Sequence, residues 1–399
     1  MVALLPLLGL LAWPAAAATA PVPSPDWTWL LGGTPEPSAE GRLAGERFAA
    51  MKHQVKRRPV EPEVTPELVQ TAISRGVAYL QKTQRRDGSW GVGYVTGPAL
   101  DTDYVRVAVT GLVLDALEHN GGERGLIERG HRFVVDRGLA DPDEVDTHGS
   151  NMNHRLYALA YGLRAALLPG AAEEDRKRNV QDFIFEIERM VGRTGGTEYN
   201  RSIVPGTPRY SAASFQLGML VQSLQEAKRQ GYKVPDFVLN SLLDEIQKSR
   251  GADATYPYRA RTAQEGSLDG ISRDPLLETL LIEAGRIKPG DNKELTRFSE
   301  NSKDLLKVLD DEEAFHHEDT HYWAKYYVLF GYLNASEALL KRFPDGDKRD
   351  AIAKKFAAEL LSIQQPDGRV VDSRWAAGPN YGTASFILAL NNLQKALAQ

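Results

Sequence analysis

The sequence predicts an all-α protein in which six pairs of helices form an α/α toroid, with one ring of helices inside another. Three observations predict it. Twelve segments space their apolar residues as helices do. The segments recur as pairs about every 55 residues, and a charged first member alternates with an apolar second member. Because the second members are apolar on both flanks, we expect the array to close into a ring; an open solenoid would leave one face wet.

The first pair begins at Thr65, a predicted N-cap, with Pro66 as the first helical residue. The segment 66–84 is amphipathic, which predicts an outer helix. Its apolar face carries Val69, Ala72, Ile73, Gly76 and Leu80. The segment 104–119 is apolar nearly all round, which predicts a buried inner helix.

The other pairs repeat this order along the chain. In the third pair, the run from Glu173 to Arg189 is charged and the run from Ser211 to Leu224 is apolar. The remaining predicted outer helices are 124–138, 172–192, 236–250, 293–309 and 347–364. The remaining predicted inner helices are 154–168, 210–229, 275–287, 321–340 and 382–397.

Composition excludes several classes of protein. The chain is 42% hydrophobic and 25% charged, with a mean hydropathy of −0.37, as in soluble globular proteins. A net charge of −5 with interspersed signs argues against a nucleic-acid partner. The chain has no cysteine, which excludes disulfides, thiol nucleophiles and thiolate zinc sites.

The N-terminal region predicts export. Residues 1–20 read as a signal peptide, because an apolar core from Leu4 to Trp13 precedes a run of small residues. The apolar run is too short for a comfortable membrane span, so we expect no stable span after cleavage and a secreted or periplasmic protein. A short anchor that is never removed is the alternative. Residues 21–63 are rich in proline and predict a linker or arm, and 64–399 is the predicted toroid.

Two turns carry a resemblance to a known superfamily. Gln84 followed by Gly88-Ser89-Trp90, after Arg75-Gly76 and Tyr79-Leu80, resembles the QW repeat of squalene–hopene and other triterpene cyclases. A degenerate copy runs from Leu360 to Gly368, with Trp375 displaced, and weaker echoes lie at 195–199, 255–258, 322–323 and 381–384. The chain thus resembles the squalene-cyclase/prenyltransferase-repeat superfamily, and most of all secreted bacterial proteins with prenyltransferase/squalene-oxidase repeats. The resemblance covers about 64–399 and implies the toroid, in which the glutamine ties the end of an outer helix to the next helix and the tryptophan stacks on it.

The chemistry of that superfamily's named enzymes is missing. Its cyclases protonate an alkene with an Asp-x-Asp-Asp motif, and Asp101-Thr102-Asp103 is one acid short. Its prenyltransferases and thioester domains need a cysteine, which this chain lacks. The resemblance therefore implies a fold without a reaction.

We expect a ligand site at the mouth where the inner helices begin, because unpaired backbone N–H groups converge there. The candidate ligand-binding residues are Asp101, Asp103, Asn153, His154, Tyr210, Arg273, His321, Tyr322 and Tyr381. His154, Tyr210, Asp103 and Arg209 are the candidate catalytic residues. The alternative is that Asp103, Asn153 and Asp274 are ordinary N-caps and that the tyrosines pack the rim.

One motif suggests a metal. His317-Glu318-Asp319-Thr320-His321 fits the H-E-x-x-H pattern of zinc peptidases. Its context is poor, because Asp319-Thr320 resemble the cap of the helix expected from His321, and Glu337 stands at an unusual spacing for a third ligand. A metallopeptidase is thus a minor alternative. A weaker divalent-metal site at His316, His317, Asp319 and His321 is another, and no cofactor is firmly predicted.

Sugar chemistry is the remaining enzymatic alternative. Asn153-His154 followed by Tyr157 faintly resembles toroidal alginate-type polysaccharide lyases, in which His or Tyr takes a proton from a uronate. Arginines at 201, 209, 259, 261 and 273 would suit an acidic polysaccharide. We therefore expect an exported toroid that binds an apolar or saccharide small molecule in its central cavity. A polysaccharide lyase or hydrolase and an interaction scaffold are the alternatives, and a ring filled by its own side chains would favour the scaffold. The sequence indicates no oligomeric state.

Overall fold

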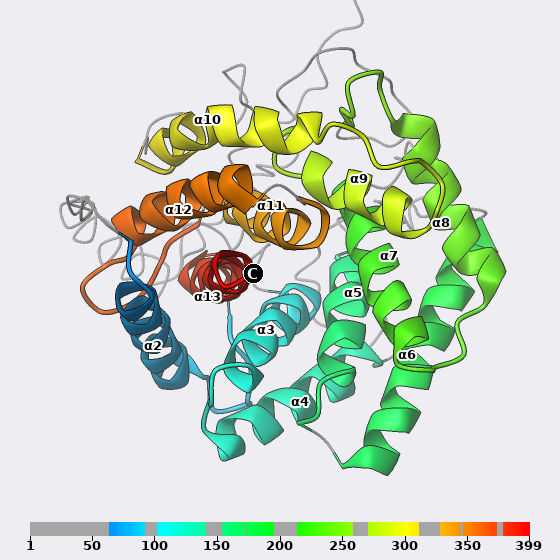
Figure 1. The fold of residues 1–399 in the computed structure, drawn as a ribbon. Helices are drawn as coiled ribbons and strands as arrows, with labels where there is room; N and C mark the ends of the chain where they lie inside the picture. The colour runs from blue at the N-terminus through cyan, green and yellow to red at the C-terminus, as the bar shows by residue number, and fades with distance from the viewer. Residues whose placement is uncertain are drawn as a thin grey trace, which may run out of the picture.

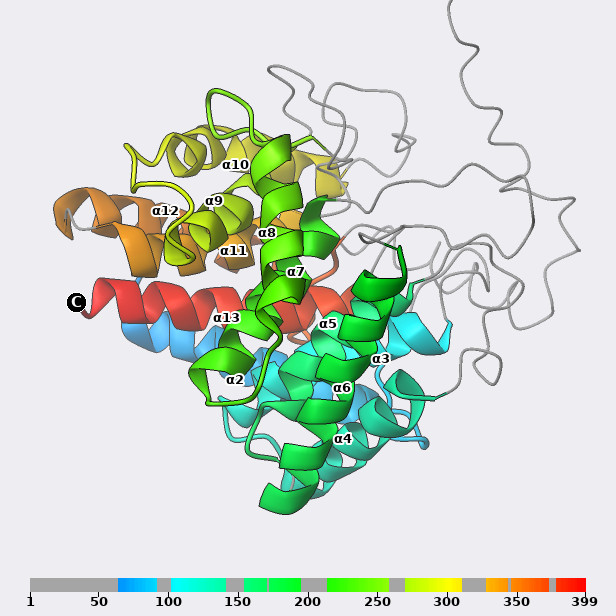
Figure 2. The same cartoon turned by 90° about the vertical axis from the view of Figure 1, so that its right-hand side faces the viewer.

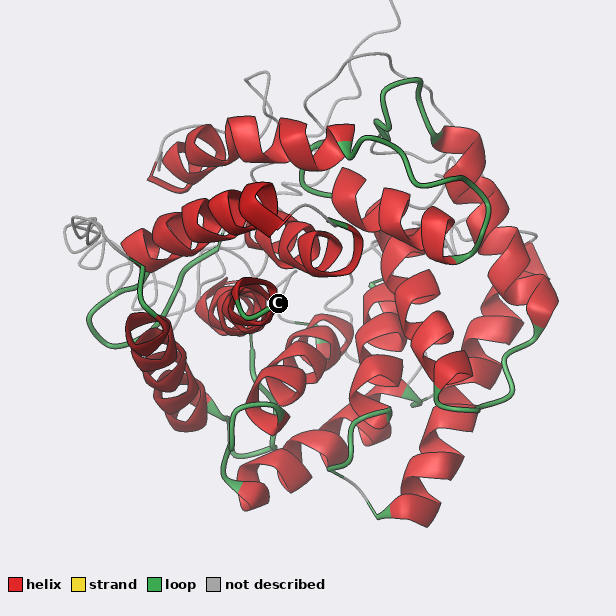
Figure 3. Cartoon of the chain, in the orientation of Figure 1, coloured by secondary structure: helices red, strands yellow, loops and turns green. Residues whose placement is uncertain are grey.

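The computed structural model describes residues 64–91, 102–140, 154–170, 172–194, 214–257, 270–310, 328–343, 346–372 and 378–399. All regular structure in these residues is helical (Figure 3). The first six helices are α2 (Pro66–Thr83), α3 (Asp103–Glu118), α4 (Arg124–Gly138), α5 (Arg155–Ala166), α6 (Glu173–Thr194) and α7 (Ser214–Arg229). The last six are α8 (Asp236–Ser249), α9 (Asp274–Glu283), α10 (Lys293–Asp310), α11 (Val328–Arg342), α12 (Gly346–Ile363) and α13 (Gly378–Leu397).

The helices form a closed inner ring with a second ring of helices around it (Figure 1). In the inner ring, α3, α5, α7, α9, α11 and α13 pack consecutively, and α13 packs back on α3. The outer helix α2 packs against both α13 and α3, and α4, α8, α10 and α12 bridge neighbouring inner helices in the same way. Each inner helix is therefore enclosed by helices, which explains why inner segments such as α3 are apolar nearly all round.

The inner helices run in one direction (Figure 2). Residues near the starts of α5, α7 and α11 contact one another through Tyr157, Phe215 and Phe330. Residues near the ends of α3 and α5 also meet, through Asp115 and Arg164. The ring consequently has an N-terminal mouth and a C-terminal face, which is the arrangement that the sequence predicted for the site.

The first and last turns fasten neighbouring outer helices alike. Nε2 of Gln84 donates to Gly88 O at 3.0 Å and to Leu126 O of α4 at 2.7 Å. Nε2 of Gln364 donates to Gly368 O at 3.0 Å and to Ala72 O of α2 at 2.8 Å. The second contact joins the two ends of the chain and closes the outer ring.

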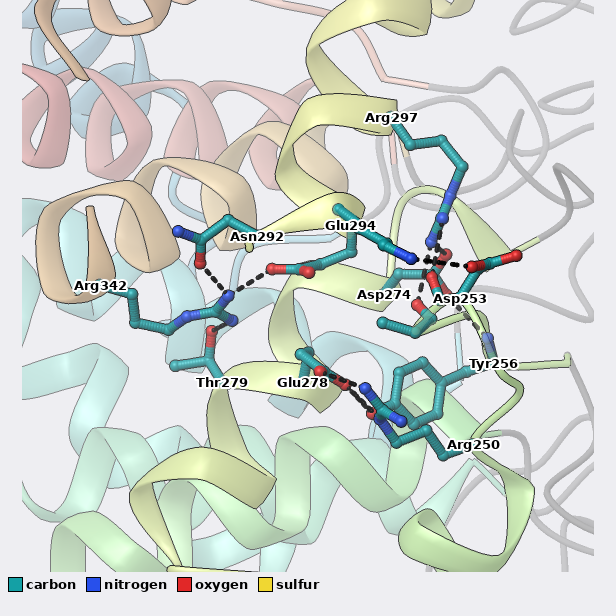
Figure 4. Close-up of polar contacts among 12 residues, drawn as sticks. Arg250, Asp253, Tyr256, Asp274, Glu278, Thr279, Asn292, Glu294, Arg297 and Arg342 are labelled. Atoms are coloured by element: carbon teal, nitrogen blue, oxygen red, sulfur yellow. Dashed lines mark hydrogen bonds and ion pairs between the residues drawn. The ribbon is translucent and has the colours of Figure 1, made fainter. Parts of the chain in front are cut away.

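A third copy of this turn precedes α9. Gly251 N donates to Thr255 O at 2.8 Å, matching Arg85 N to Ser89 O at 2.8 Å in the first copy. Tyr256 N then donates to Asp274 of the inner helix at 3.0 Å, where Trp90 N donates to Thr110 at 2.9 Å. Figure 4 shows the side chains that hold this copy in place, with Arg250 and Tyr256 on Glu278 and Arg297 on Asp274. The weak echo at 255–258 is therefore part of a real structural repeat.

Some predicted boundaries and caps were wrong. Helix α9 ends at Glu283 instead of 287, because Gly285 has a φ of 68° and ends the helix. Helix α13 begins at Gly378 instead of 382. Asp103 does not cap α3, since Thr102 accepts from Val105 N, and Asp274 is the first residue of α9. No helix among the described residues is both long and apolar enough to cross a membrane.

Candidate functional site

A row of aromatic rings crosses the N-terminal mouth. The His154 ring lies 5.8 Å from Tyr157, Tyr157 lies 5.6 Å from Phe215, and Phe215 lies 6.3 Å from Phe330, all between ring centroids. Phe215 and Phe330 stand on α7 and α11, which are separated in the inner ring by α9. The row therefore runs across the inside of the ring and does not follow its wall.

His154 occupies the start of α5. It is the N-cap residue, but its side chain makes no capping hydrogen bond. The imidazole is buried, and its Nδ1 has no hydrogen-bond partner. Burial lowers the pKa of His154 to about 4, because the protonated ring would lose its hydration. The ring is therefore neutral at pH 7, and its free nitrogen can donate a hydrogen bond to a polar ligand or accept one from it, depending on the tautomer.

Two tyrosines make a second crossing one helical turn deeper. Tyr161 of α5 is hydrogen-bonded to Tyr381 of α13, and these helices lie on either side of α3. Burial raises the pKa of Tyr161, the hydrogen bond from Tyr381 opposes that rise, and nearby Asp115 and Asp372 add to it. The Tyr161 hydroxyl is thus neutral at pH 7.

A charged network occupies the C-terminal half of the ring. Arg164 of α5 bonds Asp115 of α3 at 2.5 Å and Gln222 of α7 at 3.3 Å. Gln222 donates to Glu337 of α11 at 2.8 Å, again across the inside of the ring. Lys341 joins Glu337 at 2.7 Å to Glu283 of α9 at 2.8 Å.

The network stabilises the charges that it contains. Burial alone would raise the pKa of Asp115, but the charge of Arg164 and the hydrogen bond from His119 outweigh it and leave that pKa below its usual value. The hydrogen bond with Asp115 in turn raises the pKa of His119. The space left beside the network, between α7, α9 and α11, is about 10 Å³, which is room for one water molecule.

The described candidate residues do not all face the mouth. His154 belongs to the aromatic row, and Tyr381 is hydrogen-bonded to Tyr161 one turn below that row. Asp103 is ion-paired with Arg106 of its own helix and lies 3.8 Å from Arg137 of outer helix α4. Arg106 also bonds Asp87 and lies over the Phe133 ring, so this group faces the outer layer. Arg273 is fully buried at the start of α9, where its charge acts on Asp274.

The other candidates lie outside the described residues. They are Asp101, Asn153, Arg209, Tyr210, His316, His317, Glu318, Asp319, His321 and Tyr322. The metallopeptidase and metal-site predictions therefore stay predictions. Within the described part of the chain, no three histidine or acidic side chains are grouped closely enough to hold a metal ion.

Sequence reasoning missed most residues on the ring axis. Phe215, Phe330 and Tyr161 lie within the predicted inner helices, and nothing in the sequence indicates that they face the axis. Arg164 and Glu337 had a usable signal, because each is a charged residue in an otherwise apolar inner helix and such a charge needs a partner. Their partners are too distant in sequence to be found by spacing: 49 residues separate Arg164 from Asp115, and 115 separate Gln222 from Glu337.

Comparison with known proteins supports the fold. No family model matches the sequence, and no curated protein matches it significantly. The cellobiose 2-epimerase of Spirochaeta thermophila is similar in structure, with a TM-score of 0.55, 12% identity, and coverage of 84% of this chain and 99% of that one.

Type II terpene cyclase MstE of Scytonema is also similar. A variant in complex with its product, merosterolic acid A, aligns with a TM-score of 0.53 and 14% identity over 83% of this chain and 98% of that one. At such low identity the likeness concerns the fold alone. The chain therefore has the α/α-toroid fold of the superfamily that its turns resemble.

Proposed function

We propose that this protein binds a saccharide at the N-terminal mouth of the inner ring. The observation that supports it is the partly exposed ring of Tyr157 at the mouth, which packs on the row of buried rings, beside the polar groups of His154 and the Tyr161–Tyr381 pair. A sugar ring presents an apolar face of C–H groups and a rim of hydroxyls. Aromatic faces bind the first and neutral hydrogen-bonding groups bind the second.

A saccharide fits this interior better than an apolar chain does. MstE was solved with geranylgeranyl dihydroxybenzoate, and the epimerase is named for cellobiose. A long prenyl chain would have to extend past Tyr161 to the network of Arg164, Gln222 and Glu337. Covering buried charged and amide groups with hydrocarbon is unfavourable unless their hydrogen bonds survive.

A calorimetric titration tests the proposal. The purified protein is titrated with cellobiose, cellotriose and chitobiose, and separately with geranylgeraniol in detergent. We expect a saccharide to bind, and Tyr157→Ala to weaken it at least tenfold, which corresponds to about 1.4 kcal/mol. Phe237→Ala is the matched control, because Phe237 is 52% exposed on outer helix α8, and it should leave binding unchanged.

Each other outcome points to another function. Binding of geranylgeraniol with no saccharide binding would replace the proposal by an apolar ligand. An interaction scaffold is the second candidate, and the buried side chains that fill the axis below the mouth favour it. A scaffold predicts no response to either ligand class. Analysis of the titrated saccharide by NMR shows at the same time whether it is chemically changed.

A further inference from the structure

Helix α9 is the shortest and least deeply anchored member of the inner ring. It has 10 residues, whereas the other inner helices have 12 to 20. It buries eight residues, fewer than any other inner helix, and three of them are the polar Asp274, Glu278 and Thr279. Local stability follows buried apolar contact, so α9 should have the lowest opening free energy in the inner ring.

Polar bonds on its outer side hold α9 in place (Figure 4). Arg250, directly after outer helix α8, donates twice to Glu278 at 2.7 Å, and the Tyr256 hydroxyl donates to the same carboxylate at 2.6 Å. Arg297 of outer helix α10 donates to Asp274 at 2.8 Å. The two carboxylates are 5% and 1% exposed, but the arginines are 29% and 20% exposed. Water can therefore solvate both partners once α9 moves outward and the pairs separate.

The ring axis is closed without α9. Helices α7 and α11 flank α9 in the inner ring, and their side chains contact each other directly at two levels. The rings of Phe215 and Phe330 lie 6.3 Å apart between centroids, and Gln222 donates to Glu337 at 2.8 Å. Helix α9 can therefore move away from both neighbours without separating them.

We infer that α9 is the movable helix of the inner ring and swings outward as a unit while α7 and α11 stay in contact. This displacement exposes five buried apolar side chains, whereas displacement of α3 would expose nine. It widens the water-sized space between the three helices into a pocket, with Gln222 and Asn334 on one side and Leu276 and Leu280 of α9 on the other. The closed ring thus has a way to admit a small amphipathic molecule beside its axis, independently of what the mouth binds.

Native-state hydrogen exchange tests the movement without a ligand. We expect the central amides of α9 to exchange about 30-fold faster than those of α5, after correction for their intrinsic rates. Helix α5 is the appropriate reference, because it is the next shortest inner helix and none of its nine buried residues is charged. If α9 is as well protected as α5 and α7, it opens only together with the ring, and the inference is wrong.

A substitution in the outer bonds tests whether α9 moves alone. Glu278→Gln should speed exchange in α9 by a further factor of about ten, because it weakens a charge-assisted bond, while α7 and α11 stay within about threefold. Glu359→Gln is the matched control: Glu359 also accepts from a tyrosine and a cation, Tyr332 and Lys355, but lies on α12. It should leave exchange in α9 unchanged. Equal acceleration of α7, α9 and α11 by Glu278→Gln would overturn the inference, because α9 would then move only with its neighbours.

Discussion

Glycines at positive φ in this chain have two different reasons for being glycine. Gly88 and Gly368 have φ angles of 91° and 94°, and a Cβ on either would lie 2.5 Å and 2.2 Å from a backbone oxygen of the next outer helix. Gly121 has a φ of 71° but open space around the same position. The first two therefore serve both a turn and a close helix contact, and the third serves only a turn.

This difference predicts unequal costs for the same substitution. Gly121→Ala should destabilise by about 1 kcal/mol, the usual cost of an L residue in the left-handed region. Gly368→Ala should cost about 3 kcal/mol or more, because Arg75 O must also move away. Urea unfolding of the two variants measures both. Equal losses would mean that helix α2 can move away from the new Cβ at no cost in stability.

The buried pair of Asp274 and Arg297 predicts a pH-dependent stability. Burial raises the pKa of Asp274 to about 6, and the charge of Arg297, 2.8 Å away, holds it from rising further. Because this pKa is higher in the folded than in the unfolded chain, protonation of Asp274 contributes to the free energy of unfolding. The contribution is fully present below the unfolded pKa of 3.8 and is lost as pH rises through the folded pKa of about 6. Removing Arg297 extends that loss to higher pH.

Arg297→Met should therefore destabilise by about 3 kcal/mol at pH 8, where the buried Asp274 loses its ion-pair partner and keeps only the charge of Arg273 and the bond from Tyr256 N. At pH 5 the loss should be smaller, because Asp274 takes up a proton. Arg286→Met is the control, since Arg286 pairs with the half-exposed Asp244 at the surface. Urea unfolding at pH 5, 6.5 and 8 gives both profiles. A loss from Arg297→Met that does not change with pH would contradict the pairing.

At the scale of elements, the three turn copies differ at one telling position. Ala254 occupies the place of Gly88 and Gly368 in the third copy, and its φ of 54° is unusual for a residue with a side chain. We expect Ala254→Gly to raise stability by up to about 1 kcal/mol, since relief of about 1–2 kcal/mol exceeds the chain entropy that glycine adds. Thermal melting compares it with Ala353→Gly in α12, which should destabilise. A fall in both would show that Ala254 is unstrained.

The sequence predicted the helices well because burial leaves a periodic pattern. It predicted the site poorly because contacts across the ring leave no such pattern. Outer helices such as α6 have one buried face, and inner helices such as α3 are buried nearly all round, so apolar spacing locates both. Helix ends depend on local backbone angles, and Gly285 therefore shortened α9 unexpectedly. Contacts across the ring, such as Phe215 with Phe330 and Gln222 with Glu337, depend on closure and leave no periodic trace.

At the scale of the whole molecule, closure removes the free ends that a helical array otherwise has. In an open array the terminal repeats contact one neighbour and fray first. Here α2 packs on α13 and α12, and Arg75 donates to the carbonyls of Gln365 and Pro366 at 3.0 and 2.7 Å. The first and last helix pairs should consequently be as well protected as those in the middle.

Native-state hydrogen exchange measures this directly. Amides in the centres of α2 and α13 should show opening free energies equal to those of α5 and α7. The double variant Arg75→Met with Gln364→Ala removes the side-chain bonds between α12 and α2, and should lower the values in α2 and α12 by about 2 kcal/mol while α5 and α7 change less. Gln181→Ala removes one exposed side-chain bond to Lys233 O and serves as control. If amides in α2 and α13 of the unaltered protein had the lowest protection, the ring would behave as an open array. The contact of α2 with α12 and α13 would then contribute less to stability than the contacts between the other helix pairs.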